Sequence, residues 1–373
     1  MSASFDVIVV GLGAMGSQAL HHLARRGLRV LGLDRHRPPH GLGSSGGRTR
    51  IIREAYFEDP RYVPLVQRAY THWSAQERAL GRTLLVPTGG VMIGPRDGEL
   101  VAGALRSAET HRLAHEVLDH ARLRERFGAF APGPEVVGVW EPRAGVLLAD
   151  AAIEGALTLA GRSGAVTRYE EAVTGWTPDA RGVTVHTGTG AYRADRLVVA
   201  AGAWLPALVP DLPLPLTVTR QPVLWLASDP ERAAPAHLPI WIWEWTRGRF
   251  VYGFPDLGEG AKVARHYEGT TAIADAVDRA VSAEEAESLR ALVGRLVPGA
   301  AGPVRESLVC LYTNTPDLHF VLATLPGQPR VLVASPCSGH GFKFAPVIGE
   351  LVADLVTRGE ADLDVTLFRL AGR

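Results

Sequence analysis

The chain has 373 residues, of which 46% are hydrophobic and 21% are charged, so it is long enough for two domains and too apolar to be disordered. Its 39 Lys and Arg residues balance 39 Asp and Glu residues, which excludes a net field that would attract nucleic acid or an anionic membrane. The two cysteines, Cys310 and Cys337, are too few for a disulfide framework, and the sequence shows no signal peptide or bilayer-spanning stretch. These features predict a cytoplasmic protein with no membrane partner.

The first 34 residues have the pattern of a βαβ unit. Residues 7–10 form a continuous β-branched run, which is typical of a parallel strand covered on both faces. The motif GLGAMG follows at 11–16, and a helix is predicted from there to Arg25-Arg26, with Gly27 as its C-terminal stop. Residues 28–33 read as a second strand.

Each glycine of this motif, and the acid after the second strand, has a physical role in dinucleotide binding. Gly11 permits the tight turn, Gly13 lets a pyrophosphate approach the backbone, and Gly16 allows close packing of the helix. Free N–H groups at the helix start are expected to face phosphates, and Asp34 is expected to accept hydrogen bonds from a ribose diol. The unit predicts a dinucleotide site but does not by itself separate FAD from NAD.

A basic segment follows at residues 41–53, where glycines and serines, including Ser44, precede three arginines. Such a stretch can bind a phosphate or a substrate carboxylate, and Arg50 and Arg53 would share a face if they lay on a helix. The alternative is a solvated basic loop, which the spacing alone favours slightly.

Two later junctions resemble the first one. The apolar run 196–201 leads into Gly202, and the run 331–334 leads into the segment 338–344, which contains Gly339 and Gly341. A helix is predicted from about Pro346 to Gly359. Because open α/β sheets bind ligands at the carboxyl ends of their strands, the three junctions predict one cofactor domain built from separate stretches of chain.

The remaining segments are assigned to a second domain. The predicted cofactor domain comprises 1–87, 145–216 and 316–373, and the predicted substrate domain comprises 88–144 and 217–315. The substrate domain holds an aromatic run in which Trp241, Trp243 and Trp245 alternate with other residues. We favour a strand there, with these residues alternating between core and solvent, over a pocket lined by tryptophan.

Several single residues are ambiguous from local sequence. Lys343 lies between two phenylalanines before the predicted helix and suits either an anion partner or a surface position. Lys262 and His266 read as an exposed polar face. Cys310 lies in a strand-like run, where a buried free cysteine is the default. No spacing of residues supports a metal site.

Five blocks of sequence carry a resemblance to a known family. They are 5–11, 49–53 with 55–56 and 62–65, 252–255, Cys310 with 312–313, and SGHGFKF at 338–344. Together they resemble the monomeric sarcosine oxidase family of flavoenzymes, which includes N-methyltryptophan oxidase and pipecolate oxidase. The resemblance implies an α/β fold with a glutathione-reductase-like, Rossmann-type FAD domain, and a second domain whose mainly antiparallel sheet covers the flavin.

The resemblance also implies roles for individual residues. Arg53 and Lys343 would clamp the substrate carboxylate, Lys262 would activate oxygen, Tyr252 and His266 would line the pocket, and Arg50 would lie close to the flavin ring. Cys310 would carry FAD covalently through its sulfur, and Cys337 is not assigned that link. The residues expected at the cofactor are Gly11, Gly13, Gly16, Asp34, Ser44, Arg50, Val173, Gly202, Cys310, Gly339, Gly341 and Lys343.

The implied activity is oxidation of a secondary amino acid by a monomeric enzyme. The expected substrate is sarcosine or another N-methyl amino acid, with O2 as acceptor and formaldehyde and hydrogen peroxide among the products. N-methyltryptophan, pipecolate or proline as substrate, and a dehydrogenase with another electron acceptor, stay open. One departure from relatives bears on the choice: Ser45-Gly46 stands where they carry paired histidines, which alters the pocket beside the flavin.

Overall fold

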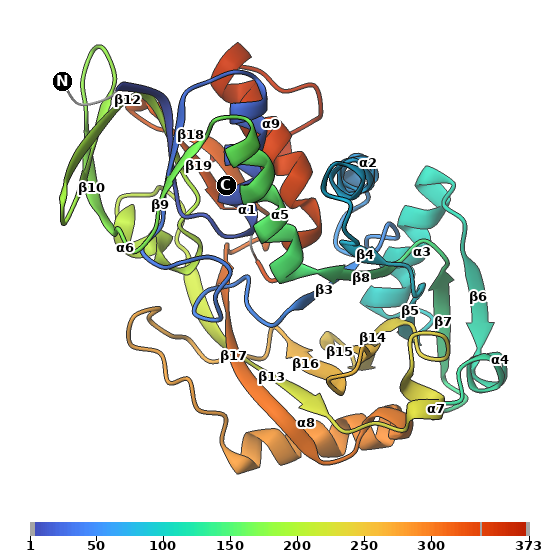
Figure 1. The fold of residues 1–373 in the computed structure, drawn as a ribbon. Coiled ribbons are helices and arrows are strands. Elements are labelled where there is room, and N and C mark those ends of the chain that lie inside the picture. Colours follow the sequence, from blue (N-terminus) through green and yellow to red (C-terminus); the bar gives the residue numbers. More distant parts are fainter. Residues whose placement is uncertain (1–3, 336–337, 371–373) are drawn as a thin grey trace.

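The computed structural model describes residues 4–335 and 338–370 and arranges them in two large sheets and one small sheet, with helices packed around them (Figure 1). Among the helices of these residues, none has the length and apolar character that a bilayer span requires.

The first sheet contains the strands that the three glycine junctions predicted. The strand β1 (Ser4–Val10) pairs in parallel with both β2 (Val30–Leu33) and β12 (Gly190–Val199), and β12 pairs in parallel with β19 (Gln328–Ser335). The predicted neighbourhood of the three junctions is therefore confirmed, because their strands lie side by side and end at the same edge. The other strands of this sheet are β9 (Val166–Arg168), β10 (Val173–Pro178), β11 (Val183–Thr187) and β18 (Val321–Leu325).

Helices cover one face of this sheet. The central helix α1 (Ala14–Arg25) packs between α5 (Ala149–Arg162) and α9 (Ala345–Arg358), as Figure 1 shows, and its residues from Ala14 to Ala24 are buried. Gly27 follows α1 with φ +82°, and Gly359 caps α9 with φ +80°, so both predicted glycine stops are confirmed. The remaining helices are α2 (Val63–Leu80), α3 (Glu99–His111), α4 (His120–Arg126), α6 (Leu205–Leu208), α7 (Pro230–Ala233) and α8 (Ala283–Leu296), with short 3₁₀ turns at Pro60–Tyr62, Gly202–Trp204, Pro298–Ala300, Phe342–Phe344 and Thr366–Phe368.

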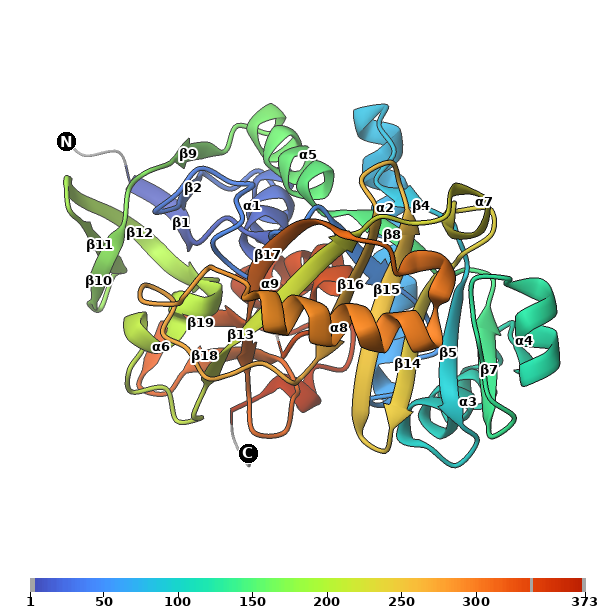
Figure 2. The ribbon, with the colours of Figure 1, turned by 90° about the horizontal axis from the view of Figure 1, so that it is seen from below.

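The second large sheet is mainly antiparallel, as the resemblance implied. Its strands follow the order β17-β13-β16-β15-β14-β5-β7-β6, and only the β14–β5 pair among them is parallel within the described residues. Helix α8 lies across one face of this sheet, which Figure 2 shows from below. The strands are β5 (Gly90–Pro95), β6 (Glu116–Asp119), β7 (Val136–Glu141), β13 (Thr217–Leu226), β14 (Ile240–Thr246), β15 (Arg249–Asp256), β16 (Ala261–His266) and β17 (Val304–Asn314).

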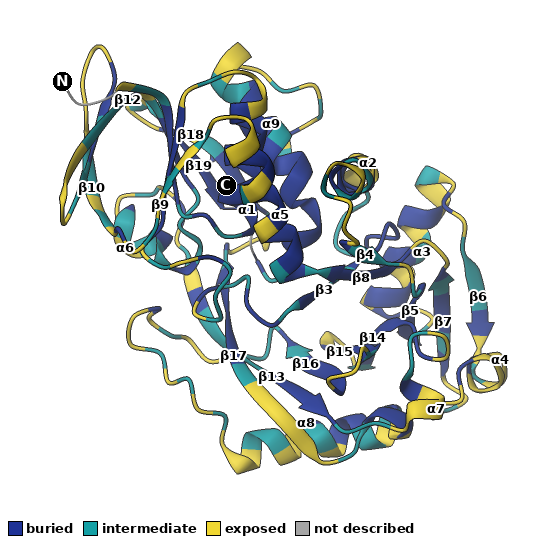
Figure 3. Cartoon of the chain, viewed as in Figure 1, coloured by how far each residue is buried: buried dark blue, intermediate teal, exposed yellow. Residues whose placement is uncertain are grey.

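The tryptophan run forms the predicted strand, β14, but the expected alternation of its tryptophans between core and solvent is wrong. Trp241, Trp243 and Trp245 are two residues apart, so they share one face of the strand. Trp241 and Trp243 belong to a second hydrophobic core, which also contains residues of α8, and Trp245 packs against that core. Figure 3 shows how burial is distributed along the chain. Ile242 points the other way and lines the central cavity.

The small sheet joins the two large ones. It consists of β3 (Thr49–Ile52), β8 (Gly145–Leu148) and β4 (Leu85–Val86), and it lies between the large sheets in Figure 1. Arg50 therefore lies on a strand, with Arg53 directly after it, and the helical arrangement considered for these two arginines is wrong.

Candidate active site

A cavity of about 380 Å³ lies where the three sheets meet. Residues from the ends of β1, β12 and β19 form one part of its lining, and residues of β15, β16 and β17 form another. All but one of the predicted site residues line this cavity. They are Gly11, Gly13, Asp34, Ser44, Arg50, Arg53, Val173, Gly202, Tyr252, Lys262, His266, Cys310, Gly339, Gly341 and Lys343.

Gly16 is the exception, and its position explains why. A Cβ atom on Gly16 would lie 1.7 Å from the carbonyl oxygen of Gly11, so glycine lets α1 press against the back of the turn. Gly11 itself has φ +84°, and a Cβ there would lie 2.5 Å from the oxygen of Ala200 on the neighbouring junction. The packing role predicted for Gly16 and the tight-turn role predicted for Gly11 are confirmed.

The acid at the end of β2 organises this turn. The carboxylate of Asp34 accepts hydrogen bonds from the backbone N–H groups of Leu12, at 2.7 Å, and His36, at 2.8 Å. Each oxygen of a carboxylate has a further lone pair, so Asp34 can still accept hydrogen bonds from a ribose diol in the cavity.

One N–H group at the start of α1 has a partner that the sequence did not predict. The N–H of Ala14 donates to the hydroxyl of Ser45 at 3.2 Å, and a Cβ on Gly13 would lie 3.2 Å from the same oxygen. Ser45, which departs from the family pattern, therefore lies against the glycine turn at the start of α1.

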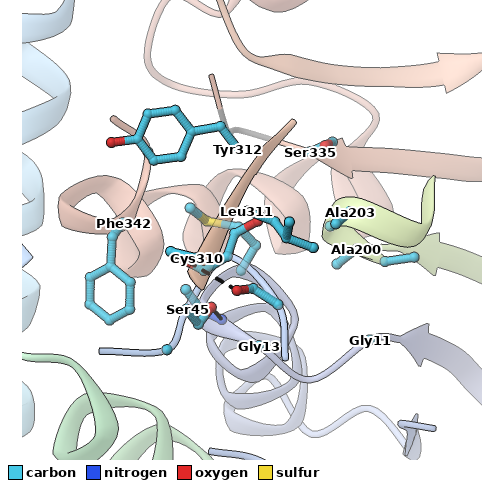
Figure 4. A pocket seen from close by; sticks show the side chains of 18 of the residues that line it. Gly11, Gly13, Ser45, Ala200, Ala203, Cys310, Leu311, Tyr312, Ser335 and Phe342 are labelled. Atoms are coloured by element: carbon cyan, nitrogen blue, oxygen red, sulfur yellow. Dashed lines mark hydrogen bonds between the residues drawn. The ribbon is translucent and has the colours of Figure 1, made fainter. Parts of the chain in front are cut away.

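Cys310 lies in the middle of the lining, on β17, as Figure 4 shows. Its sulfur lies 3.5 Å from the carbonyl oxygen of Ser44 and 3.7 Å from the guanidinium of Arg50. The predicted buried strand position of Cys310 is confirmed. Cys337 lies outside the described residues.

Lys262 is buried in β16, with 3% of its surface exposed, so the expectation of an exposed polar face is wrong. Its ammonium donates to the carbonyl oxygens of Gly47, at 2.7 Å, and Thr49, at 2.8 Å, and to the hydroxyl of Thr49 at 3.1 Å. Burial, together with the charge of Arg50, lowers the pKa of Lys262 well below its usual range.

His266 is also buried, and it shares a face of β16 with Lys262 because residues four apart on a strand point the same way. Its Nδ1 lies 3.1 Å from the hydroxyl of Tyr312, and burial lowers its pKa to about 3. The imidazole is thus neutral at physiological pH. Tyr252, from the adjacent β15, completes this wall of the cavity.

Arg53 is 2% exposed, so the solvated basic loop favoured by spacing is wrong. Its guanidinium pairs with both carboxylate oxygens of Glu58, at 2.8 Å and 2.7 Å. Burial raises the pKa of Glu58, but the charges of Arg53, His340 and Lys343 and the hydrogen bond from Arg53 together outweigh it and lower the value to about 2. Glu58 lines the cavity and was missed from the sequence, where its only signal is an acid five residues after a motif arginine.

Lys343 is 5% exposed, so the surface alternative is wrong here too. Its ammonium donates to the carbonyl oxygen of His340 at 2.9 Å, and burial together with the charge of Arg53 lowers its pKa to about 7. Both cations make cation–π contacts with the ring of Tyr56. The Arg53 guanidinium lies 4.4 Å from the ring centroid, and the Lys343 ammonium lies 5.1 Å from it. Two positive side chains therefore meet at one end of the cavity.

The glycine of the third junction is required by close packing within the chain. Gly339 has φ +74°, and a Cβ there would lie 2.4 Å from the ring of Tyr312. With Gly11, Gly13 and the start of α1 in the same lining, the cavity fits a dinucleotide cofactor.

Comparison with known proteins identifies that cofactor. A family profile described as "FAD dependent oxidoreductase" matches residues 6–355. The chain belongs to this family. It is a flavoprotein oxidoreductase, and FAD rather than NAD is its cofactor.

Individual relatives cover nearly the whole chain. It is 44% identical to "Monomeric sarcosine oxidase" of Streptomyces avermitilis over 99% of this chain and 97% of the relative. It is 36% identical to "N-methyl-L-tryptophan oxidase" of Salmonella heidelberg over 98% of each. Among solved structures, "NikD, an unusual amino acid oxidase" matches with a TM-score of 0.87 at 25% identity, over 99% of this chain and 98% of that one.

Proposed function

We propose that the chain is an oxidase of secondary amino acids, with sarcosine or another N-methyl amino acid as substrate. O2 and water are the other reactants, and the products are the demethylated amino acid, formaldehyde and hydrogen peroxide. The relatives named sarcosine oxidase and N-methyl-L-tryptophan oxidase support this substrate class. The observation that carries the proposal is the pair of buried cations, Arg53 and Lys343, at one end of the cavity.

The cation pair is the proposed clamp for the substrate carboxylate. Two buried positive groups over one ring repel each other, and a carboxylate between them relieves that repulsion. Arg53 supplies planar, paired N–H donors, and Lys343 supplies a point charge. Because Glu58 holds Arg53 in the absence of substrate, an incoming carboxylate must compete with Glu58 for that guanidinium.

Fixing the carboxylate orients the rest of the substrate. In well-aligned systems, such orientation lowers a reaction barrier by up to about 7–11 kcal/mol. Neutral His266 and the phenol of Tyr252 face the same cavity and add no charge of their own to it. We propose that these two residues line the pocket in which the amine lies neutral before oxidation.

FAD, when bound, accepts two electrons from the substrate and delivers them to oxygen. We propose that Gly11, Gly13 and the start of α1 bind its pyrophosphate and that Asp34 binds its ribose. We propose a covalent bond from FAD to the sulfur of Cys310, which is supported by the position of that sulfur in the lining. The amino end of α9 follows the lining residues directly and favours negative charge at that side of the cavity.

Lys262 is the proposed site of oxygen activation. A buried cation favours the negative charge that develops when oxygen takes up an electron. Three protein oxygens hold the ammonium in place, so it needs no rearrangement at that step.

We also propose the division into an FAD domain of 1–87, 145–216 and 316–373 and a substrate domain of 88–144 and 217–315. The arrangement of the two large sheets supports this division. Each described strand of the first large sheet falls in the proposed FAD domain, and each described strand of the second falls in the proposed substrate domain. The name of the Streptomyces relative supports a monomer. We propose a cytoplasmic location from the balanced charge and the two cysteines.

The test is anaerobic stopped-flow reduction of the flavin by sarcosine, N-methyltryptophan, pipecolate and proline. We expect sarcosine to bleach the flavin at the highest kcat/KM, and air to restore the colour with stoichiometric peroxide. Faster reduction by N-methyltryptophan or a cyclic imino acid would identify that compound, and not sarcosine, as the substrate. Slow reoxidation by air, with rapid transfer to a quinone, would make the protein a dehydrogenase, and no bleaching by any of the four would refute the proposal.

A further inference from the structure

A second carboxylate, outside the cavity lining, contacts the turn that carries the proposed clamp. Glu141 is the last residue of β7 and is 1% exposed. Its Oε1 accepts the backbone N–H of Glu54 at 2.6 Å, and its Oε2 accepts the N–H of Ala55 at 2.8 Å. Within residues 4–335 and 338–370, no salt bridge neutralises this carboxylate.

The two N–H groups belong to the turn that begins at Arg53. The guanidinium of Arg53 donates to the carbonyl oxygen of Ala55 at 2.9 Å. Ala55 is therefore held on its N–H side by Glu141 while it holds Arg53 on its carbonyl side. The same turn continues to Glu58, the ion-pair partner of Arg53.

The turn has little freedom on its other side. The hydroxyl of Ser107, on α3, donates to the carbonyl oxygen of Tyr56. A Cβ on Gly103 of the same helix would lie 2.4 Å from the carbonyl oxygen of Phe57, so α3 lies directly against the turn. The backbone of the turn is thus restrained from two elements: by Glu141, which lies on β7, and by helix α3.

Burying a carboxylate without a cation is costly, and here burial raises the pKa of Glu141 to about 7 even though the two N–H groups lower it. Hydrogen bonds from N–H groups to an ionised acceptor are about twice as strong as neutral ones. An ionised Glu141 therefore holds the turn more rigidly than a neutral side chain of the same shape.

We propose that Glu141 is a positioning residue of the carboxylate clamp: it fixes the Glu54–Ala55 backbone so that Arg53 reaches the substrate carboxylate. This inference rests on the proposed clamp of Arg53 and Lys343. Glu141 acts through Arg53 and contacts neither substrate nor cofactor.

The test uses the purified holoenzyme and methoxyacetate, which has an ether oxygen in place of the amine of sarcosine and cannot be oxidised in the same way. The variant Glu141→Gln keeps the shape, but its NH2 group faces one of the two N–H donors. We expect its Kd for methoxyacetate, measured from the flavin spectrum, to rise about tenfold, which corresponds to the loss of one charge-assisted hydrogen bond. Because the clamp also orients the substrate, the limiting rate of flavin reduction by saturating sarcosine should fall as well, but by less than the tenfold change in Kd.

Glu77→Gln is the matched control. The carboxylate of Glu77 accepts the backbone N–H groups of Leu84, at 2.8 Å, and Leu85, at 3.0 Å, outside the cavity lining. We expect its Kd to match that of the wild type. A rise equal to that of Glu141→Gln would show a general loss of structure and overturn the positioning role.

A double-mutant cycle separates this inference from the proposed function. If Glu141 acts through Arg53, then Glu141→Gln should weaken binding less than about twofold in an Arg53→Ala background. A tenfold loss in that background, or an unchanged Kd for Glu141→Gln alone while Arg53→Ala binds weakly, would overturn the positioning role only. An unchanged Kd for Arg53→Ala would overturn the clamp itself. Should Glu141→Gln yield no folded holoenzyme, Glu141→Asp, which retains the charge and shortens the reach, takes its place with the same expected direction.

Discussion

Replacement of Gly16 by alanine tests the cofactor site at its most crowded point. The added Cβ would lie 1.7 Å from the oxygen and 2.8 Å from the carbon of the Gly11 carbonyl. An ordinary contact needs roughly twice the first distance, so the Gly11 peptide must move or α1 must withdraw. Gly11 cannot move freely. Its N–H donates to the carbonyl oxygen of Leu33 at 2.8 Å, and a Cβ built on Gly11 would lie only 2.5 Å from the carbonyl oxygen of Ala200.

Overpacking in a tight core costs about 1–3 kcal/mol, and a clash with backbone falls at the upper end of that range. If FAD requires the unshifted Gly11 turn, this cost also opposes the initial binding of FAD, before the proposed covalent bond forms. About 3 kcal/mol then corresponds to roughly a hundredfold loss in that affinity, because each 1.4 kcal/mol is a factor of ten. We therefore expect Gly16→Ala to purify with little flavin and a lowered Tm. The assay is the ratio of visible flavin absorbance to protein absorbance, with thermal unfolding measured in parallel.

Gly161→Ala is the control for this prediction. Gly161 also lies in a helix, α5, but a Cβ there would meet no atom within 4 Å. We expect full flavin content and a gain in stability of about 0.5–1 kcal/mol, since alanine favours the helix. A Gly16→Ala protein with the flavin content and Tm of the wild type would refute the packing argument.

Three further predictions concern the cavity. Lys262→Met should slow reoxidation of the reduced flavin by air at least tenfold while anaerobic reduction changes little, and equal effects on both steps would contradict the oxygen role. Cys310→Ser should release its flavin into acid, whereas the wild type should retain it; release from the wild type would exclude the covalent bond. Lys343, whose pKa burial lowers to about 7, is charged below that pH and neutral above it. The affinity for methoxyacetate should therefore fall by up to about tenfold per pH unit above pH 7, and Lys343→Met should bind weakly without this fall. A fall that persists in Lys343→Met would assign the titration to another group. Glu141 would not be that group, because its ionised form above about pH 7 strengthens the clamp.

The opening βαβ unit could be predicted from sequence because its signals are local. A β-branched run, a glycine turn and a helix stop lie within the first 27 residues, and each acts through the backbone of its own neighbours. The same reasoning correctly predicted the strand of Cys310 and placed β1, β12 and β19 together, since parallel strands of one sheet share an edge. The local pattern also determined a strand at β14, although not which way its tryptophans face the second core.

The state of the cations was decided only by tertiary structure. Spacing favoured solvent exposure for Arg53 and Lys262, yet both are buried, because partners from other segments satisfy them. Lys262 finds its three acceptors more than 200 residues earlier in the chain, at Gly47 and Thr49. Glu58 and Glu141 were not identified from sequence for the same reason. A charged side chain shows no periodicity that separates a buried group from an exposed one; its burial depends on whether distant backbone and opposite charges meet it in the folded chain.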